Sequence, residues 1–181
     1  MNENVTVTKR LVGTAAFAAL SFVISLLEFP IFPAASFLQL DFSMAFILLS
    51  GFIFGPISGI FASAVKELLR FMIGSGTGGV GEIANFAITV CFIIIPTVVY
   101  KYKKGLPTVI ITLIMGCLLQ VTASLLVNRF INFPLFMGEG AAEAFARLWY
   151  FVLLFNLIKS VSVSVIAIML YKRISGFIKR I

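Results

Sequence analysis

The chain has 181 residues, of which 61% are hydrophobic and 12% are charged, and its formal net charge is +7. Its mean hydropathy of +1.13 is far above that of soluble domains, so we expect an all-α integral membrane protein. About 20 residues are needed for each helical span, which allows six spans and leaves no room for a soluble catalytic domain. Two cysteines in apolar stretches and the lack of histidine disfavour a disulfide scaffold, a zinc site and histidine-based catalysis.

The basic residues gather in three clusters beside the apolar stretches. These are Lys9 and Arg10, then Lys101, Lys103 and Lys104, and finally Lys172, Arg173, Lys179 and Arg180. With an even number of spans, all three clusters lie on one side of the bilayer. The positive-inside rule predicts that this side, with both termini, is cytoplasmic. The net charge therefore indicates the topology of a multi-pass protein of the cell membrane, and no nucleic-acid partner is expected.

Six spans are predicted within a single membrane domain that covers residues 1–181. They lie at about residues 8–27, 41–54, 56–74, 81–100, 107–127 and 148–171. The first apolar run is too long for the hydrophobic region of a signal peptide, so we interpret it as a retained span. Within it, Ala15 and Ala19 are four residues apart and allow another helix to approach closely. That helix could belong to the same chain or to a partner.

The connections on the outer side are unusual in composition. Prolines at 30 and 33 end the first helix, and the apolar loop that follows is interpreted as a lid over a pocket. Residues 74–82 contain five glycines but lack the Lys-Ser/Thr of a P-loop, so close backbone contact with a ligand is favoured over nucleotide binding. Between the last two spans, the alanine-rich part of residues 132–149 is predicted to form a short surface helix.

The last span carries Asn156 and Lys159 in its middle, three residues apart and therefore on one helix face. A lysine in hydrocarbon costs about 2.5–3.5 kcal/mol, so it normally faces a cavity or a partner. A ligand-facing role is favoured. The alternatives are that Lys159 reaches to the interface, or that it pairs with a carboxylate, such as Glu67 or Glu82, to hold helices together. In the third span, Lys66, Glu67 and Arg70 are interpreted as an internal ion cluster.

Polar groups from four segments are expected at the outer end of the bundle. They are Gln39, the backbone of residues 74–81, Asn85, Asn128, Asn156 and Lys159. Amides offer a donor beside an acceptor, and the lysine offers donors only. Together they match the carbonyl, N–H and carbonyl edge of an imide, while phenylalanines would supply apolar walls. The predicted ligand is a flat heterocycle with an imide edge.

The sequence resembles the substrate-binding (S) components of energy-coupling factor (ECF) vitamin transporters, most of all the riboflavin-specific RibU family. The resemblance is carried by EFPIFPAASFLQLDFS (28–43), GFIFGPISGI (51–60), KELLRFMIGSGTGGVGEIANF (66–86) and FNLIK (155–159). It covers essentially the whole chain. It implies six helices with both termini in the cytoplasm, and a vitamin site near the outer face that the loop after the first span closes.

The resemblance also implies roles for individual residues. Asn128, Asn156 and Lys159 would hydrogen-bond the isoalloxazine edge of riboflavin. The other implied substrate-binding residues are Asn85, Gln39, Leu40, Thr77 and Gly78, with the ribityl chain near Asn85 and the glycine-rich loop. Ala15 and Ala19 would form the docking face for a transmembrane coupling subunit. Two ATPase subunits would supply the energy, and riboflavin would be a transported ligand rather than a cofactor.

Three alternatives remain open at this point. The first is an S component for another vitamin, such as thiamine or pantothenate, although an anionic ligand would call for more arginine. The second is a membrane-embedded enzyme such as a lipid transferase, which would need a convergent acid, metal or nucleophile cluster. The seven carboxylates are instead scattered along the chain. The third is a non-transporting scaffold, which would leave Asn156 and Lys159 unexplained.

Overall fold

The computed structural model describes residues 3–178, with side chains described from residue 7 to residue 171. Its α-helices are α1 (Glu3–Ser25), α2 (Ser43–Phe54), α3 (Pro56–Gly74), α4 (Val80–Tyr102), α5 (Leu106–Val127), α6 (Phe133–Met137) and α7 (Ala141–Ile178). Strands β1 (Phe29–Pro30) and β2 (Gln39–Leu40) pair antiparallel, and the 3₁₀ turn η1 (Pro33–Ala35) lies between them. A π turn, η2 (Asn128–Asn132), and a 3₁₀ turn, η3 (Gly138–Gly140), flank α6.

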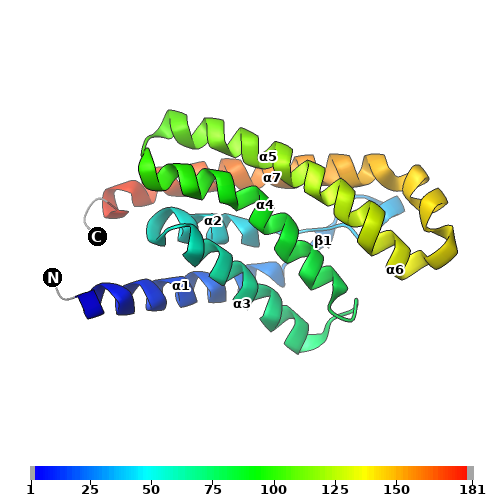
Figure 1. Cartoon of the computed structure of the whole chain (residues 1–181), viewed down its shortest axis with the longest axis horizontal. Helices are drawn as coiled ribbons and strands as arrows, with labels where there is room; N and C mark the ends of the chain where they lie inside the picture. The colour runs from blue at the N-terminus through cyan, green and yellow to red at the C-terminus, as the bar shows by residue number, and fades with distance from the viewer. Residues whose placement is uncertain (1–2, 179–181) are drawn as a thin grey trace.

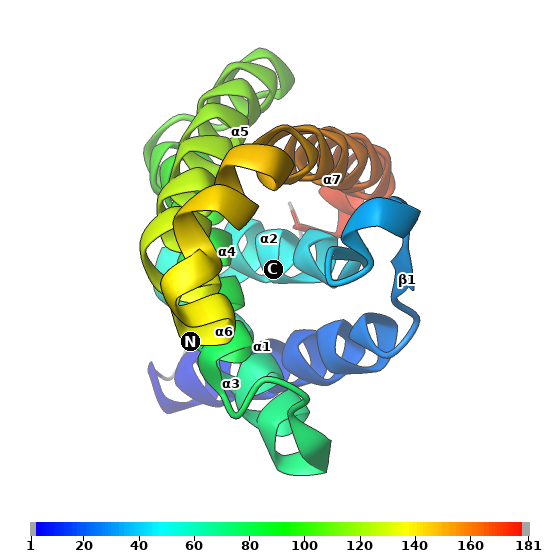
Figure 2. The same cartoon turned by 90° about the vertical axis from the view of Figure 1, so that its right-hand side faces the viewer.

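The short helix α2 is the centre of the bundle. It packs against α1, α3, α4 and α7, and Figure 2 shows it enclosed by them. Its sequence is apolar on every side, as expected for a helix with no solvent-facing surface. Ile47, Leu48 and Leu49 are fully buried against Phe92 of α4 and Val163 of α7. The core therefore forms around α2, and the other helices surround it.

Glycines allow neighbouring helices to cross at close range. A Cβ atom added at Gly59 of α3 would lie 3.2 Å from the Cα atom of Gly51 in α2. At the contact between α4 and α5, a Cβ atom added at Gly116 would lie 2.5 Å from the carbonyl oxygen of Phe92. Small residues at such crossings bring backbones together and increase the van der Waals contact that holds membrane helices together.

The two ends of the bundle differ (Figure 1). α1 begins and α7 ends at one end, where the turn between α2 and α3 and the connection between α4 and α5 also lie. Residues 26–42, 75–79 and 128–140 connect the helices at the opposite end, which we call the pocket end. The exposed basic residues of the first two clusters, Lys9, Arg10, Lys101, Lys103 and Lys104, lie away from the pocket end, whereas the exposed Arg129 lies in a connection at the pocket end.

The third basic cluster is only partly covered by the structure. Lys179 and Arg180 lie outside the described residues, and the side chains of Lys172 and Arg173 are outside the described range. The side of the membrane on which each end lies therefore stays a prediction.

By length and composition, three helical runs could cross a membrane: Val7–Ser25, Val80–Tyr102 and the continuous run Leu106–Tyr171. The last run includes α5, α6, α7 and the two turns between them. α2 has only 12 residues, and α3 contains Lys66, Glu67 and Arg70. These features explain why α2 and α3 do not stand out as spans, and the number of six spans stays a prediction.

The prediction of a separate surface helix in the alanine-rich segment is wrong. Ala141 and the alanines after it form the first turns of α7, which continues as one helix of 38 residues. The preceding connection is also helical, because η2 and α6 continue the path of α5. Pro134 has no N–H to donate to a carbonyl one turn back, and the π turn lies directly before it.

Candidate ligand-binding site

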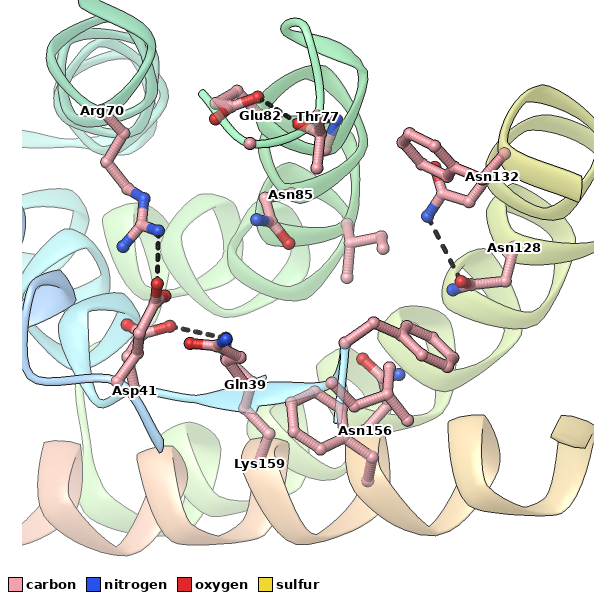
Figure 3. A pocket seen from close by; sticks show the side chains of 18 of the residues that line it. Gln39, Asp41, Arg70, Thr77, Glu82, Asn85, Asn128, Asn132, Asn156 and Lys159 are labelled. Carbon is pink, nitrogen blue, oxygen red and sulfur yellow. Dashed lines mark hydrogen bonds and ion pairs between the residues drawn. The ribbon is translucent and has the colours of Figure 1, made fainter. Parts of the chain in front are cut away.

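A cavity of about 490 Å³ opens at the pocket end. The walls of the cavity come from five parts of the chain. These are the connection between α1 and α2, the half of α3 nearer the pocket end, the start of α4, η2 with α6, and the middle of α7. This volume is within the range of small-molecule sites, which are typically about 300–1,000 Å³. Figure 3 shows polar side chains from these elements facing one another across the cavity.

Most of the predicted site residues meet in this cavity. Its lining includes Gln39, Thr77, Asn85, Asn128, Asn156 and Lys159. Leu40 and Gly78 are not among the described residues that line it. Leu40 follows Gln39 on strand β2, so its side chain points to the opposite face and is buried in an apolar cluster with Phe133 and Phe155. Gly78 has a φ of +62°, a left-handed conformation that shapes the turn into α4.

The π turn aligns two asparagines with the cavity. Its defining hydrogen bond runs from the Phe133 N–H to the Asn128 carbonyl oxygen. Asn128 Nδ2 donates to the Ser124 carbonyl oxygen at 2.8 Å, and Asn132 Nδ2 donates to Asn128 Oδ1 at 3.2 Å. The Oδ1 atom of Asn132 is buried and has no partner among the described residues. This atom has almost no accessible surface, so the Asn132 amide must turn toward the cavity before Oδ1 can accept a hydrogen bond from a ligand N–H group.

Asn132 was not predicted from the sequence, although its spacing offered a signal. It lies four residues after Asn128, so a helix brings the two amides to one face. On the facing helix, Asn156 Nδ2 donates to the Val152 carbonyl oxygen at 2.9 Å. Its Oδ1 atom accepts a long hydrogen bond of 3.5 Å from Gln120 Nε2. Each amide nitrogen carries two hydrogens, so these asparagines retain donors for a ligand.

Lys159 lines the cavity and also forms an ion pair, with Nζ 2.8 Å from Asp41 Oδ2. The other oxygen of Asp41 accepts a 2.8 Å hydrogen bond from the Ser43 N–H at the start of α2. The alternative considered from the sequence, that Lys159 pairs with a carboxylate, is confirmed, but the partner is Asp41 and not either of the two examples considered, Glu67 and Glu82. Glu67 pairs instead with Lys66 at 2.6 Å, because the two are buried side by side on α3. Sequence reasoning missed Asp41 as the partner.

The predicted ion cluster on α3 is present and extends to the mouth of the cavity. Arg70 donates to Glu28 Oε1 at 2.7 Å and to the Ser25 carbonyl oxygen at 2.6 Å. These two bonds join α3 to the end of α1 and to the beginning of the loop that was interpreted as a lid. Charge-assisted hydrogen bonds of this kind fix geometry well, so the start of that loop is anchored.

The apolar part of the cavity wall is largely aromatic. Phe37, Phe133, Phe136 and Phe155 line it together with Leu38 and Ile88. The rings of Phe37 and Phe133 meet edge to face with their centroids 5.8 Å apart. Phe37 and Leu38 belong to the loop between β1 and β2, and Leu38 is buried against residues of α6 and α7. The loop therefore packs over the cavity as a folded wall.

Comparison with known proteins identifies the family. The profile of the family described as "ECF transporter, substrate-specific component" matches residues 9–171. A protein named riboflavin transporter RibU from Staphylococcus aureus is 32% identical over 98% of this chain and 96% of its own length. A protein named riboflavin transporter FmnP from Bacillus subtilis is 26% identical over 95% of each chain.

A solved structure agrees with these sequence matches. It is described as the S component of a bacterial ECF transporter, and it superposes with a TM-score of 0.84 at 32% identity. The match covers 95% of this chain and 98% of that one. The relatives are transport proteins rather than enzymes. The fold and the sequence agree over nearly the whole length, so this chain belongs to the substrate-specific components of ECF transporters.

Proposed function

We propose that this chain is the riboflavin-binding membrane subunit of an ECF-type importer. Two kinds of observation support the proposal. The relatives that match nearly the full chain are named as riboflavin transporters. In addition, Asn128, Asn132 and Asn156 surround an aromatic-walled cavity, and this arrangement is the observation that carries the proposal.

The chemistry of the cavity is complementary to the isoalloxazine ring. The pyrimidine edge of that ring presents a carbonyl, an N–H and a carbonyl in a row. Asn128, Asn156 and Lys159 supply donors for the carbonyl oxygens, and the Asn132 side chain, once turned toward the cavity, supplies its Oδ1 atom as an acceptor for the N–H. The phenylalanine rings provide apolar surface for the ring faces. Asn85, Thr77 and Gln39 remain for the hydroxyl groups of the ribityl chain.

The same proposal covers the transport cycle. The chain crosses the cell membrane six times with both termini in the cytoplasm, and it captures the vitamin from the outer face through the pocket end. Ala15 and Ala19 are exposed on α1, where a transmembrane coupling subunit docks. Two ATPase subunits bound to that coupling subunit supply the energy for release on the inner side. The bundle itself contributes the binding site.

The test is flavin binding to the protein purified in detergent. We would titrate it with riboflavin and follow the quenching of flavin fluorescence for the wild-type protein, Asn156→Ala and Lys159→Ala. Each substitution removes a hydrogen-bond donor and is expected to weaken binding by about 1–3 kcal/mol. Lys101→Ala at the opposite end and Thr122→Ala on the exposed face of α5 serve as matched controls. Neither control is expected to change the affinity.

The outcome also separates riboflavin from other vitamins. If the wild-type protein does not bind riboflavin at micromolar concentration, the riboflavin assignment is wrong. Direct titration with thiamine and pantothenate by calorimetry would then identify the alternative ligand of this S component. If riboflavin binds but both pocket variants have the same affinity as the controls, the ligand is correctly assigned but it binds somewhere other than this cavity.

A further inference from the structure

The charged side chains that line the cavity are balanced in pairs, with one exception. Asp41 pairs with Lys159, Glu28 pairs with Arg70, and Lys66 pairs with Glu67 just behind the wall. Glu82 also lines the cavity, but it takes part in none of the ion pairs among the described residues. The six charged side chains of the lining are three acids and three bases, and counting the Glu67 carboxylate behind Lys66 gives a sum of one negative charge. Glu82, at the start of α4, is the carboxylate left without an ion-pair partner among these described residues.

The carboxylate of Glu82 is held in place by the glycine-rich loop. Its Oε2 atom accepts hydrogen bonds from Ser75 Oγ at 2.8 Å and from Thr77 Oγ1 at 2.9 Å. Both hydroxyls are themselves fixed, because they accept bonds from backbone N–H groups of the same loop. A charge fixed in this way interacts with a ligand without first having to be ordered. The glycine-rich loop thus holds the Glu82 carboxylate at the cavity, where its oxygen atoms can accept hydrogen bonds from a ligand.

Glu82 lies across the cavity from the groups proposed to hold the flavin ring. Figure 3 shows Glu82 and Thr77 on one side, and Asn156 and Lys159 on the other. A ligand whose ring is bound by the asparagines would therefore extend its flexible chain toward the glycine-rich loop. Arg70 also lies near this side, but Glu28 balances its charge. The end of the ligand's flexible chain would therefore meet the negative charge of Glu82, which no ion pair balances.

From this arrangement, and on the basis of the proposed function, we infer that Glu82 makes the site selective for uncharged flavins over their phosphate esters. The carboxylate accepts hydrogen bonds from the hydroxyl groups of an uncharged ribityl chain. A terminal phosphate has no proton to donate when it is a dianion, and it is repelled by the like charge. Selectivity arises from this repulsive element as well as from the favourable contacts.

The experiment compares two ligands in three proteins. Dissociation constants for riboflavin and for riboflavin 5′-phosphate would be measured by fluorescence quenching for the wild-type protein, Glu82→Gln and Glu82→Asp. The readout is the ratio of the two constants. Wild type is expected to favour riboflavin, Glu82→Gln to reduce that preference roughly tenfold, and Glu82→Asp to retain most of it. Glu143→Gln, an exposed carboxylate of α7 outside the cavity, is the matched control and is expected to keep the wild-type ratio.

A second measurement requires no variant. Raising the salt concentration from about 0.05 M to about 0.5 M screens charge repulsion, so the preference of the wild-type protein for riboflavin should shrink. The inference is overturned if the ratio is insensitive to salt, or if Glu82→Gln and wild type share the same ratio while riboflavin binds normally. If the wild-type protein binds neither flavin, the proposed function fails, and the selectivity fails with it.

Discussion

Lys159 and Asp41 are 118 positions apart in the sequence, yet their side chains meet at 2.8 Å in the wall of the cavity. The side chain of Lys159 is 12% exposed and that of Asp41 is 6% exposed. The pair joins the middle of α7 to the short connection between β2 and α2, directly after the strand that ends the loop over the cavity. Separating such a pair leaves one charge buried without compensation, which is more costly than replacing both partners.

The first prediction concerns Asp41→Asn. Loss of the carboxylate leaves the Lys159 ammonium mostly buried without a counter-charge, so we expect thermal stability to fall by the equivalent of about 3 kcal/mol. Flavin affinity should also fall, because Lys159 is no longer held in its position. Thermal unfolding in detergent and flavin titration would measure the two effects.

The double variant Asp41→Asn/Lys159→Met is the control for this prediction. It removes both charges, so it should be more stable than Asp41→Asn alone while binding flavin no better. If Asp41→Asn keeps both the stability and the affinity of the wild-type protein, the ion pair has neither role.

Much of the fold could be predicted from hydropathy and spacing, because the bilayer imposes long apolar helices. The ends of these helices were harder to predict. Ala141 begins α7 rather than a separate surface helix, since nothing in the local sequence stops a helix between Ala141 and Leu148. The central position of α2 was also not predicted. The sequence of a short apolar helix does not show whether the helix faces lipid or protein, because its position depends on how the other helices pack around it.

Several residues that line the cavity could also be predicted from the sequence. Asn128, Asn156 and Lys159 stand out because polar side chains are costly in apolar helices. Asn132 could have been found from its spacing to Asn128. The pairing of Lys159 with Asp41 could not, because contacts between distant segments leave no local periodicity. Leu40 does not line the cavity, because it follows Gln39 on strand β2 and alternate side chains of a strand point to opposite faces, so its role stays a prediction.

The second prediction concerns Asn132, whose Oδ1 atom is buried without a partner among the residues that the structure describes. Asn132→Ala removes this acceptor and also the bond that orients Asn128, so riboflavin affinity should fall by about 1–3 kcal/mol. Fluorescence titration would measure the loss. Phe130→Ala changes an exposed side chain in the same π turn and should leave the affinity unchanged. Equal affinities for the two variants would remove Asn132 from the site.

The third prediction tests the close contact between α4 and α5. A methyl group at Gly116 would lie 2.5 Å from the Phe92 carbonyl oxygen, and this backbone atom can move away only if a helix shifts. Gly116→Ala should therefore lower stability by about 1–3 kcal/mol through overpacking. Gly140→Ala, which meets no atom within 4 Å, is the matched control. Equal melting temperatures for the two variants would show that the crossing is looser than described.

The last prediction separates binding from transport. Ala15 and Ala19 are exposed on α1, at a distance from the cavity, so enlarging them should not affect the ligand. In the proposed assembly, however, a bulky side chain at either position would hold the coupling subunit away from α1. Ala15→Trp and Ala19→Trp should retain wild-type flavin affinity in detergent but lose most riboflavin uptake in cells that also express the coupling and ATPase subunits.

Ile114→Trp places the same bulky side chain on the exposed face of α5 and should preserve both binding and uptake. Co-purification of the coupling subunit with each variant would show whether docking itself has been lost. Normal uptake by Ala15→Trp and Ala19→Trp would place the docking surface on another face of the bundle. Loss of flavin binding by either variant would instead indicate that α1 supports the cavity. The hydrogen bonds of Arg70 to Ser25, at the end of α1, and to Glu28 anchor the loop that forms the cavity wall.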